Sequence, residues 1–188
     1  MERKTIASLF IAGLMIFSIV GFMLVDVGVS EQKRTYGDFT FYRTESGWKT
    51  NSGVKDVLFN FFPDQVSQVL VDTKAALILT NTPVLGVTYD PNSSSAQSFG
   101  QIQYYLEQVF QDNDHFFVAR GLTNASGFSA LHEISCLNSS QSFPVLVLER
   151  GNETKIVSEG YCIHAQAASN QDLFLILDRI VYVIMGVL

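Results

Sequence analysis

The chain has 188 residues, enough for one ordinary domain and a short additional segment. Hydrophobic residues make up 47% and charged residues only 16%, which excludes a disordered chain and favours contact with a membrane. The 18 acidic residues outnumber the 12 basic ones, and the net charge of -6 argues against a nucleic-acid partner. Two cysteines are too few for a disulfide-rich mini-protein or a four-cysteine metal centre.

An uncharged, apolar run from Thr5 to Val25 follows the basic pair Arg3-Lys4. Its 21 residues would make a helix of about 31 Å, which matches a hydrocarbon core of about 30 Å. We therefore predict a membrane anchor over residues 1–30, in which residues 5–25 contact lipid and the N-terminus stays in the cytoplasm. A cleaved signal peptide and a pilin-like assembly helix are the alternatives, although a signal peptide has a shorter apolar core.

Four Asn-X-Ser/Thr sequences follow in the part predicted to lie outside the membrane, at Asn92, Asn124, Asn138 and Asn152. They fall in polar stretches, as glycosylated surface sites do. The same pattern arises from ordinary Asn- and Ser-rich loops. The four asparagines are therefore candidate glycosylation sites that agree with an extracytoplasmic domain.

Residues 31–83 are predicted to hold a linker, a β-hairpin and a first strand–helix pair. The alternating stretch Phe39–Arg43 and the turn residues Glu45–Gly47 indicate the hairpin. The apolar run Val57–Phe62 indicates a strand, and Asp64 can cap a helix after it.

From residue 84 onward the pattern alternates between strands and helices. Val84–Tyr89 is a buried type of strand, and a polar loop leads into a helix with one apolar stripe. The stripe consists of Phe99, Ile102, Leu106, Val109 and Phe110. Two further strands flank the turn residues Arg150–Asn152, which predicts a hairpin. A final helix to Leu188 is too short to span a bilayer. We expect it to be buried on most sides, with Asp172, Arg179 and the edge through Asp178 and Tyr182 toward water.

This order of elements, with a proline before the second group of strands, resembles the thioredoxin fold. Pro144, Gly151 and Gly160 fall where thioredoxins have a cis-proline, a turn glycine and a strand-closing glycine. The predicted fold class is therefore α/β: a transmembrane helix followed, over residues 84–188, by a thioredoxin-like three-layer core with a mixed sheet. The resemblance implies a cis peptide bond before Pro144 and a groove at Phe143 and Pro144 that binds the backbone of an extended peptide.

The redox motif of that family is missing. No cysteine lies between Val84 and Phe110, where thioredoxins carry Cys-X-X-Cys at a helix N-terminus. Thr88 stands where the family has a buried acid. We therefore expect neither the catalytic dithiol of thioredoxins nor a cofactor.

Cys136 and Cys162 are the main chemical candidates. Outside the cytoplasm two cysteines usually form a structural disulfide, and two separate buried thiols are the alternative. A metal site is a third possibility, because His132 and Cys136 share the spacing of one helix face and Cys162 and His164 the spacing of one strand face. These spacings match no familiar zinc motif.

A second candidate site is the loop after the strand Val84–Tyr89, with Asp90, Pro91, Asn92 and Ser94. Thioredoxin-like folds place their site at this strand end, and carboxylate, amide and hydroxyl groups there can bind a ligand. The alternative is a turn that caps the following helix.

The leading functional hypothesis is a membrane-anchored, extracytoplasmic module that binds or scaffolds another envelope protein or a peptide. The second is an atypical thiol-disulfide or metal-handling protein that uses Cys136 and Cys162. The third is a pilin-like assembly subunit, in which the N-terminal helix packs against copies of itself.

Overall fold

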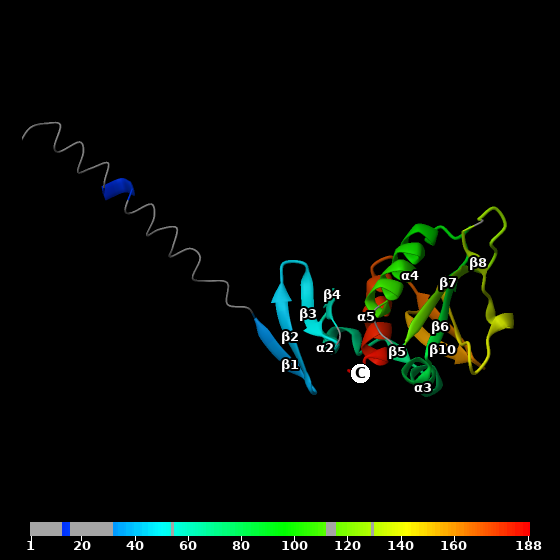
Figure 1. The fold of residues 1–188 in the computed structure, drawn as a ribbon, viewed down its shortest axis with the longest axis horizontal. Helices are drawn as coiled ribbons and strands as arrows, with labels where there is room; N and C mark the ends of the chain where they lie inside the picture. Colours follow the sequence, from blue (N-terminus) through cyan, green and yellow to red (C-terminus); the bar gives the residue numbers. More distant parts are fainter. Residues whose placement is uncertain (1–12, 16–31, 54, 112–115, 129) are drawn as a thin grey trace, which may run out of the picture. The chain divides into compact units, whose positions relative to one another are not determined.

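The structure, a computed structural model, describes residues 13–15, 32–53, 55–111, 116–128 and 130–188 (Figure 1). Residues Lys33–Leu188 form one compact unit with two β-sheets. One sheet has four strands and the other has seven.

Among the described residues, no helix combines the length and the apolar character that crossing a membrane requires. The span predicted over residues 5–25 lies outside the described residues, apart from residues 13–15, and so do the alternatives proposed for it. The fold class with a transmembrane helix and a thioredoxin-like three-layer domain is therefore corrected to a mixed α/β fold with a seven-stranded sheet. Many of the described hydrophobic residues lie in a large core to which both sheets and the helices contribute.

The first sheet consists of four antiparallel strands in chain order: β1 (Lys33–Tyr36), β2 (Phe39–Thr44), β3 (Gly47–Asn51) and β4 (Asp56–Phe59). The β2–β3 hairpin turns between Thr44 and Gly47, where the turn residues predicted it. Strand alternation places Phe41, Trp48 and Phe59 in the interior. This sheet therefore offers one aromatic face for packing against the rest of the unit.

The second sheet has the strand order β5-β10-β11-β9-β6-β7-β8. The bounds are β5 (Leu70–Val71), β6 (Val84–Tyr89), β7 (Phe117–Leu122), β8 (His132–Glu133), β9 (Val145–Arg150), β10 (Lys155–Glu159) and β11 (Cys162–Ala167). The strands from β11 to β8 run parallel, and β10 runs antiparallel to β11. The central strands β6 and β9 are almost continuously apolar, as strands covered on both faces are.

The predicted hairpin of β9 and β10 is wrong, because β11 lies between these strands. Strand β11 is more buried than β10, so the more apolar strand takes the interior place in the sheet. The tight turn joins β10 to β11 instead. Gly160 in that turn has φ of 65°, which glycine adopts without steric cost.

The helices are α2 (Pro63–Val66), α3 (Thr73–Asn81), α4 (Ala96–Phe110) and α5 (Asp172–Ile184), and Cys136–Asn138 form the 3₁₀ turn η1. The predicted stripe of α4 is buried as expected. The buried Gln103 fixes this helix to the sheet, because its Nε2 donates to the carbonyl oxygens of Val87 at 2.6 Å and Gly121 at 2.8 Å.

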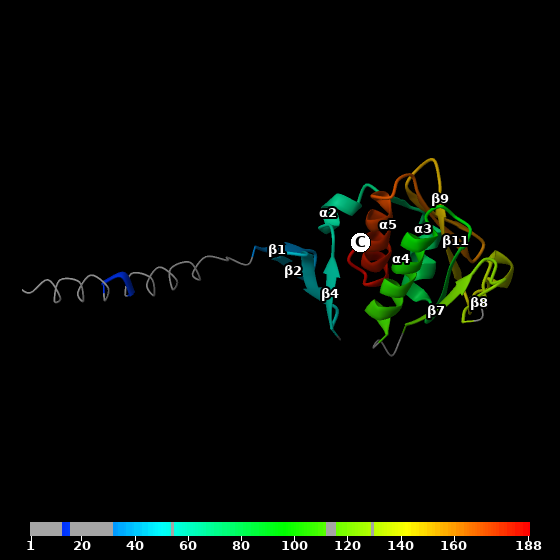
Figure 2. The ribbon, with the colours of Figure 1, turned by 90° about the horizontal axis from the view of Figure 1, so that it is seen from above.

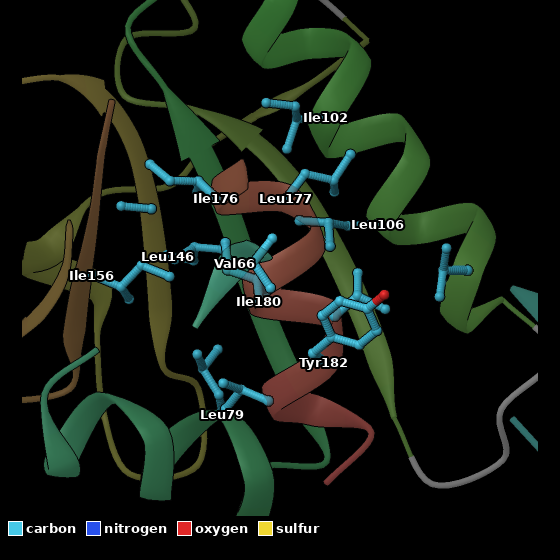
Figure 3. Close-up of a cluster of buried hydrophobic side chains, with 14 of the residues drawn as sticks. Val66, Leu79, Ile102, Leu106, Leu146, Ile156, Ile176, Leu177, Ile180 and Tyr182 are labelled. Atoms are coloured by element: carbon cyan, nitrogen blue, oxygen red, sulfur yellow. The ribbon is translucent and has the colours of Figure 1, made fainter. Parts of the chain in front are cut away.

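Helix α5 lies between the two sheets, as Figures 1 and 2 show from perpendicular directions. On one side the ring of Tyr182 stacks on Phe59 at 4.0 Å between centroids. On the other side Ile176 and Ile180 lie near Leu146 of β9 (Figure 3). The helix therefore completes the cores of both sheets.

Burial on most sides of the last helix is confirmed, but the predicted edge toward water is wrong. Asp178 is 1% exposed and Tyr182 is fully buried, because the four-stranded sheet covers this side. A sequence pattern cannot reveal that a second sheet packs there.

The face of the seven-stranded sheet that points away from α5 has no helix as long as α5 over it among the described elements. A smaller cluster of Ile134, Val145, Val147 and Cys162 lies there, with Phe143 and Cys136 packed against it. The cover comes from the segment between β7 and β9, and this segment carries one of the two cysteines.

Candidate functional site

Cys136 and Cys162 lie at disulfide distance, with 2.02 Å between their sulfur atoms and 5.2 Å between their Cα atoms. This is the pairing expected from the sequence. Cys136 begins η1 and is partly exposed, whereas Cys162 begins β11 and is 2% exposed. The bond therefore joins the covering segment to a central strand of the sheet.

A histidine and a glutamate lie beside this disulfide. His164 follows Cys162 by two residues, so both side chains point to the same face of β11. The Nε2 atom of His164 lies 3.8 Å from the sulfur of Cys136, and its Nδ1 atom lies 3.1 Å from Oε1 of Glu149. Because a carboxylate only accepts hydrogen bonds, Nδ1 carries the hydrogen and Nε2 faces the sulfur.

The position of Glu149 is set by the register of the sheet. Glu149 of β9 lies opposite Gln166 in the parallel β9–β11 ladder. Gln166 is two residues after His164 in β11, so their side chains lie on the same face of the sheet. Gln166 Nε2 also donates to Oε1 of Glu149, at 2.8 Å. Glu149 is therefore hydrogen-bonded to both His164 and Gln166, and these bonds fix the orientation of the imidazole ring.

Of the four residues considered for a metal, three come together. The ligand atoms of Cys136, Cys162 and His164 all lie within 4.8 Å of one another. His132 is not a member of this group in the described part of the chain and lies exposed on the edge strand β8. The predicted set therefore needs correction, because the segment around His132 and Cys136 is not the single helix that would place both on one face.

The implied cis-proline groove also needs correction. None of the described peptide bonds is cis, so the bond before Pro144 is trans. The backbone of Phe143 pairs with Ser140 in an isolated bridge, which uses both its N–H and its carbonyl oxygen. That backbone is therefore not free to bind a peptide as the resemblance implied.

A hollow of about 330 Å³ does lie beside Pro144. Its walls come from α3 and from residues just before β6, β9 and β11, namely Lys74, Leu77, Ile78, Asn81, Thr82, Gln141, Pro144 and Tyr161. Leu77 is largely exposed, and the Lys74 ammonium lies 5.8 Å from the centre of the Tyr161 ring. Phe143 is not among the residues that line this hollow.

The strand-end loop forms a turn that begins at Asp90, and the N-cap residue of α4, Ser95, makes no side-chain capping hydrogen bond. The N–H of Asn92 donates to Oδ1 of Asp90 at 2.9 Å, and the N–H of Ser93 donates to the Asp90 carbonyl oxygen. Asp90 lines a hollow of about 300 Å³ with Glu149 and Arg150, whereas Pro91, Asn92 and Ser94 are not among the residues of its wall. Of the predicted loop set, only Asp90 therefore lines this hollow.

An apolar cleft of about 220 Å³, which no sequence pattern predicted, lies between β4, α4 and α5. Its lining residues are Leu58, Phe59, Asn60, Ser98, Gln101, Ile102, Tyr105, Leu173, Phe174 and Leu177. Leu58 and Phe174 are 39% and 48% exposed. Their apolar side chains therefore remain accessible around a mainly hydrophobic hollow.

Asp178 of α5 does not line this cleft and is buried against the segment that follows β4. It accepts hydrogen bonds from the N–H of Phe61 at 2.8 Å and from Nδ2 of Asn60 at 3.2 Å. Burial raises the pKa of Asp178, and the hydrogen bonds lower it. Burial is the larger effect, so the pKa rises to about 7. Burial, together with the charge of Asp178, also raises the pKa of Tyr105 to about 12.

The four candidate glycosylation asparagines, Asn92, Asn124, Asn138 and Asn152, are all exposed. Exposure is what an acceptor site requires. Their modification stays a prediction.

No family model, curated protein or solved structure matches this chain. The function is therefore inferred from the geometry of the sites described above.

Proposed function

We propose that the chain is a protein-binding or scaffolding module that works in an exported, oxidising compartment. The observation that carries this proposal is the apolar cleft between β4, α4 and α5, with the exposed Leu58 and Phe174 beside it. Its proposed occupant is an apolar side chain of an extended segment from another envelope protein.

The size of the cleft supports a side-chain occupant. Its volume of about 220 Å³ is below the ~300–1,000 Å³ of typical small-molecule sites. Leu173 and Leu177 form apolar wall, and Asn60, Ser98 and Gln101 supply polar groups. A buried apolar anchor surrounded by polar groups is the usual arrangement of a protein–protein contact.

The cysteine pair supports the proposal of an oxidising compartment. Cys136 and Cys162 at disulfide distance favour an oxidising environment, because cytosolic reductants keep most thiols reduced. The resemblance to thioredoxins stays a prediction, and the binding proposal does not use it.

The proposal is tested by selecting random peptides that bind the immobilised full chain. We expect enrichment of peptides with a large apolar residue. The variant Ser98→Phe fills the cleft and should weaken these peptides by roughly 10- to 100-fold, the equivalent of losing the ~1.5–3 kcal/mol from one buried apolar side chain.

The matched control is Gln97→Phe, because Gln97 is the exposed neighbour of Ser98 on α4 and does not line the cleft. It adds the same ring to the same helix and should leave peptide affinity unchanged. Peptides that bind Ser98→Phe as tightly as the wild-type chain, or a selection without apolar peptides, would refute the proposal.

A further inference from the structure

We propose that reduction of the Cys136–Cys162 disulfide creates a Zn²⁺ site, formed by the two thiolates and Nε2 of His164. Glu149 acts as a positioning residue for His164. This inference goes beyond protein binding and does not depend on it.

The spacing of the donor atoms fits zinc. Tetrahedral Zn²⁺ with Zn–S of about 2.3 Å and Zn–N of about 2.0 Å requires its sulfur and nitrogen ligands to be about 3.5 Å apart. The observed distance from Cys136 Sγ to His164 Nε2 is 3.8 Å, and all three donor atoms lie within 4.8 Å of one another. Once the sulfur–sulfur bond is broken, the two sulfurs need to separate only to about 3.8 Å.

The imidazole is already oriented as a metal ligand. Histidines that bind a metal usually donate their other ring N–H to a carboxylate, which fixes the tautomer and strengthens the ligand. His164 Nδ1 lies 3.1 Å from Oε1 of Glu149, which also accepts a bond from Gln166. Nε2 is thereby directed toward the sulfur of Cys136.

Solvent can reach the site from one side. Cys162 is buried, but Cys136 is partly exposed and the side chain of His164 is 24% exposed. The three protein ligands leave the fourth tetrahedral position to water. Soft thiolate and borderline imidazole donors favour Zn²⁺ over the hard cations Mg²⁺ and Ca²⁺.

The reductant is a dithiol. Its thiolate attacks the more exposed sulfur of Cys136, the bond to Cys162 breaks, and the Cys162 sulfur takes up a proton. The second thiol of the reductant then displaces Cys136 as a thiol and closes a disulfide in the reductant. Two electrons and two protons pass to the protein, and Zn²⁺ then replaces the two thiol protons, which go to water.

The test uses Co²⁺ as a spectroscopic probe for Zn²⁺ on the full chain. One sample stays oxidised, and another is reduced with a trialkylphosphine, which becomes a phosphine oxide and is removed. We expect one equivalent of Co²⁺ to give thiolate-to-cobalt absorption in the reduced chain only, and Zn²⁺ to displace it.

Three variants separate a built site from loose thiols. Glu149→Gln should keep the thiolate absorption but weaken Co²⁺ binding by about 10- to 100-fold, as loss of a supporting carboxylate does. His164→Gln removes a ligand and should weaken binding further. His132→Gln, at the exposed histidine of β8, should bind Co²⁺ as the wild-type chain does.

Three results would overturn the proposal. One is a reduced chain without thiolate-to-cobalt absorption. Another is equal affinity in His164→Gln and the wild-type chain. The third is circular dichroism that shows the reduced, metal-free chain to be unfolded, because the arrangement at His164 would then not exist before the metal binds.

Discussion

A carboxyl group such as Asp178, held between a helix and a sheet, loses most of the water that stabilises its charge. Hydrogen bonds from Asn60 and Phe61 replace part of that hydration. Burial still dominates, and it raises the pKa of Asp178 to about 7. Asp178 therefore joins the segment after β4 to α5 through a group whose pKa lies near neutral pH.

This titration predicts a pH dependence of stability. The folded chain keeps the proton on Asp178 up to pH of about 7, whereas the unfolded chain releases it near 3.8. Between these values the folded state binds more protons, so the free energy of unfolding should fall as pH rises, by up to about 1.4 kcal/mol per pH unit. In urea denaturation at pH 4.5 and 7, the Asp178→Asn variant should not show this fall in the free energy of unfolding.

The matched control is Asp38→Asn, which changes an exposed acid and should keep the slope of the wild-type chain. The same slope in Asp178→Asn would mean that Asp178 is ionised in the folded protein at pH 4.5.

At the scale of single elements, α5 is the helix that both sheets share. The ring of Tyr182 stacks on Phe59 of β4, and its hydroxyl donates to the carbonyl oxygen of Phe61, two residues after that strand, at 2.7 Å. Ile180 is fully buried. Phe174 lies on the same helix but is 48% exposed.

The loss of stability on truncating a side chain of α5 should therefore depend strongly on its position. Ile180→Ala leaves a cavity in the core and should cost about 2–5 kcal/mol in the free energy of unfolding. Phe174→Ala should cost less than half as much in the same urea titration, although it removes more atoms. Equal losses would show that α5 is not buried in solution as the structure has it.

The elements that local patterns specify were predictable, and those set by distant partners were not. The stripe of α4 follows from its 3.6-residue period alone. The place of β11 between β9 and β10 depends on which strand gains more from an interior position, which the turn at Gly151 does not indicate. The same applies at the candidate site. The spacing of Cys162 and His164 was readable from strand alternation, but Glu149 reaches His164 only through the parallel register of β9 and β11.

At the scale of the whole molecule, the two faces of the seven-stranded sheet are covered differently. Helices and the first sheet cover one face through a large core, whereas the segment between β7 and β9 covers the other through a small cluster. The Cys136–Cys162 bond is the covalent link between that segment and the sheet. The smaller cover therefore depends on the bond more than the large core does.

Removing this link should lower global stability. The two cysteines are 26 residues apart. In the chain-entropy model, closing such a loop lowers the entropy of the unfolded chain and raises the free energy of unfolding by about 3.5 kcal/mol. The double variant Cys136→Ser/Cys162→Ala should lose about this much in urea denaturation, and reduction of the wild-type chain should cause a similar loss. Stability unchanged in both would mean that the segment holds its place without the bond.

The position of α5 between two sheets also affects how the protein is made. Both sheets precede this helix in the chain, and each needs one of its faces to complete a core. While the ribosome is still adding residues before Ile184, the aromatic face of the first sheet and the apolar face of the second remain without their partner. Nascent chains of this protein therefore expose adhesive surfaces until α5 has been made, and chaperones that shield such surfaces would act on the chain before that point.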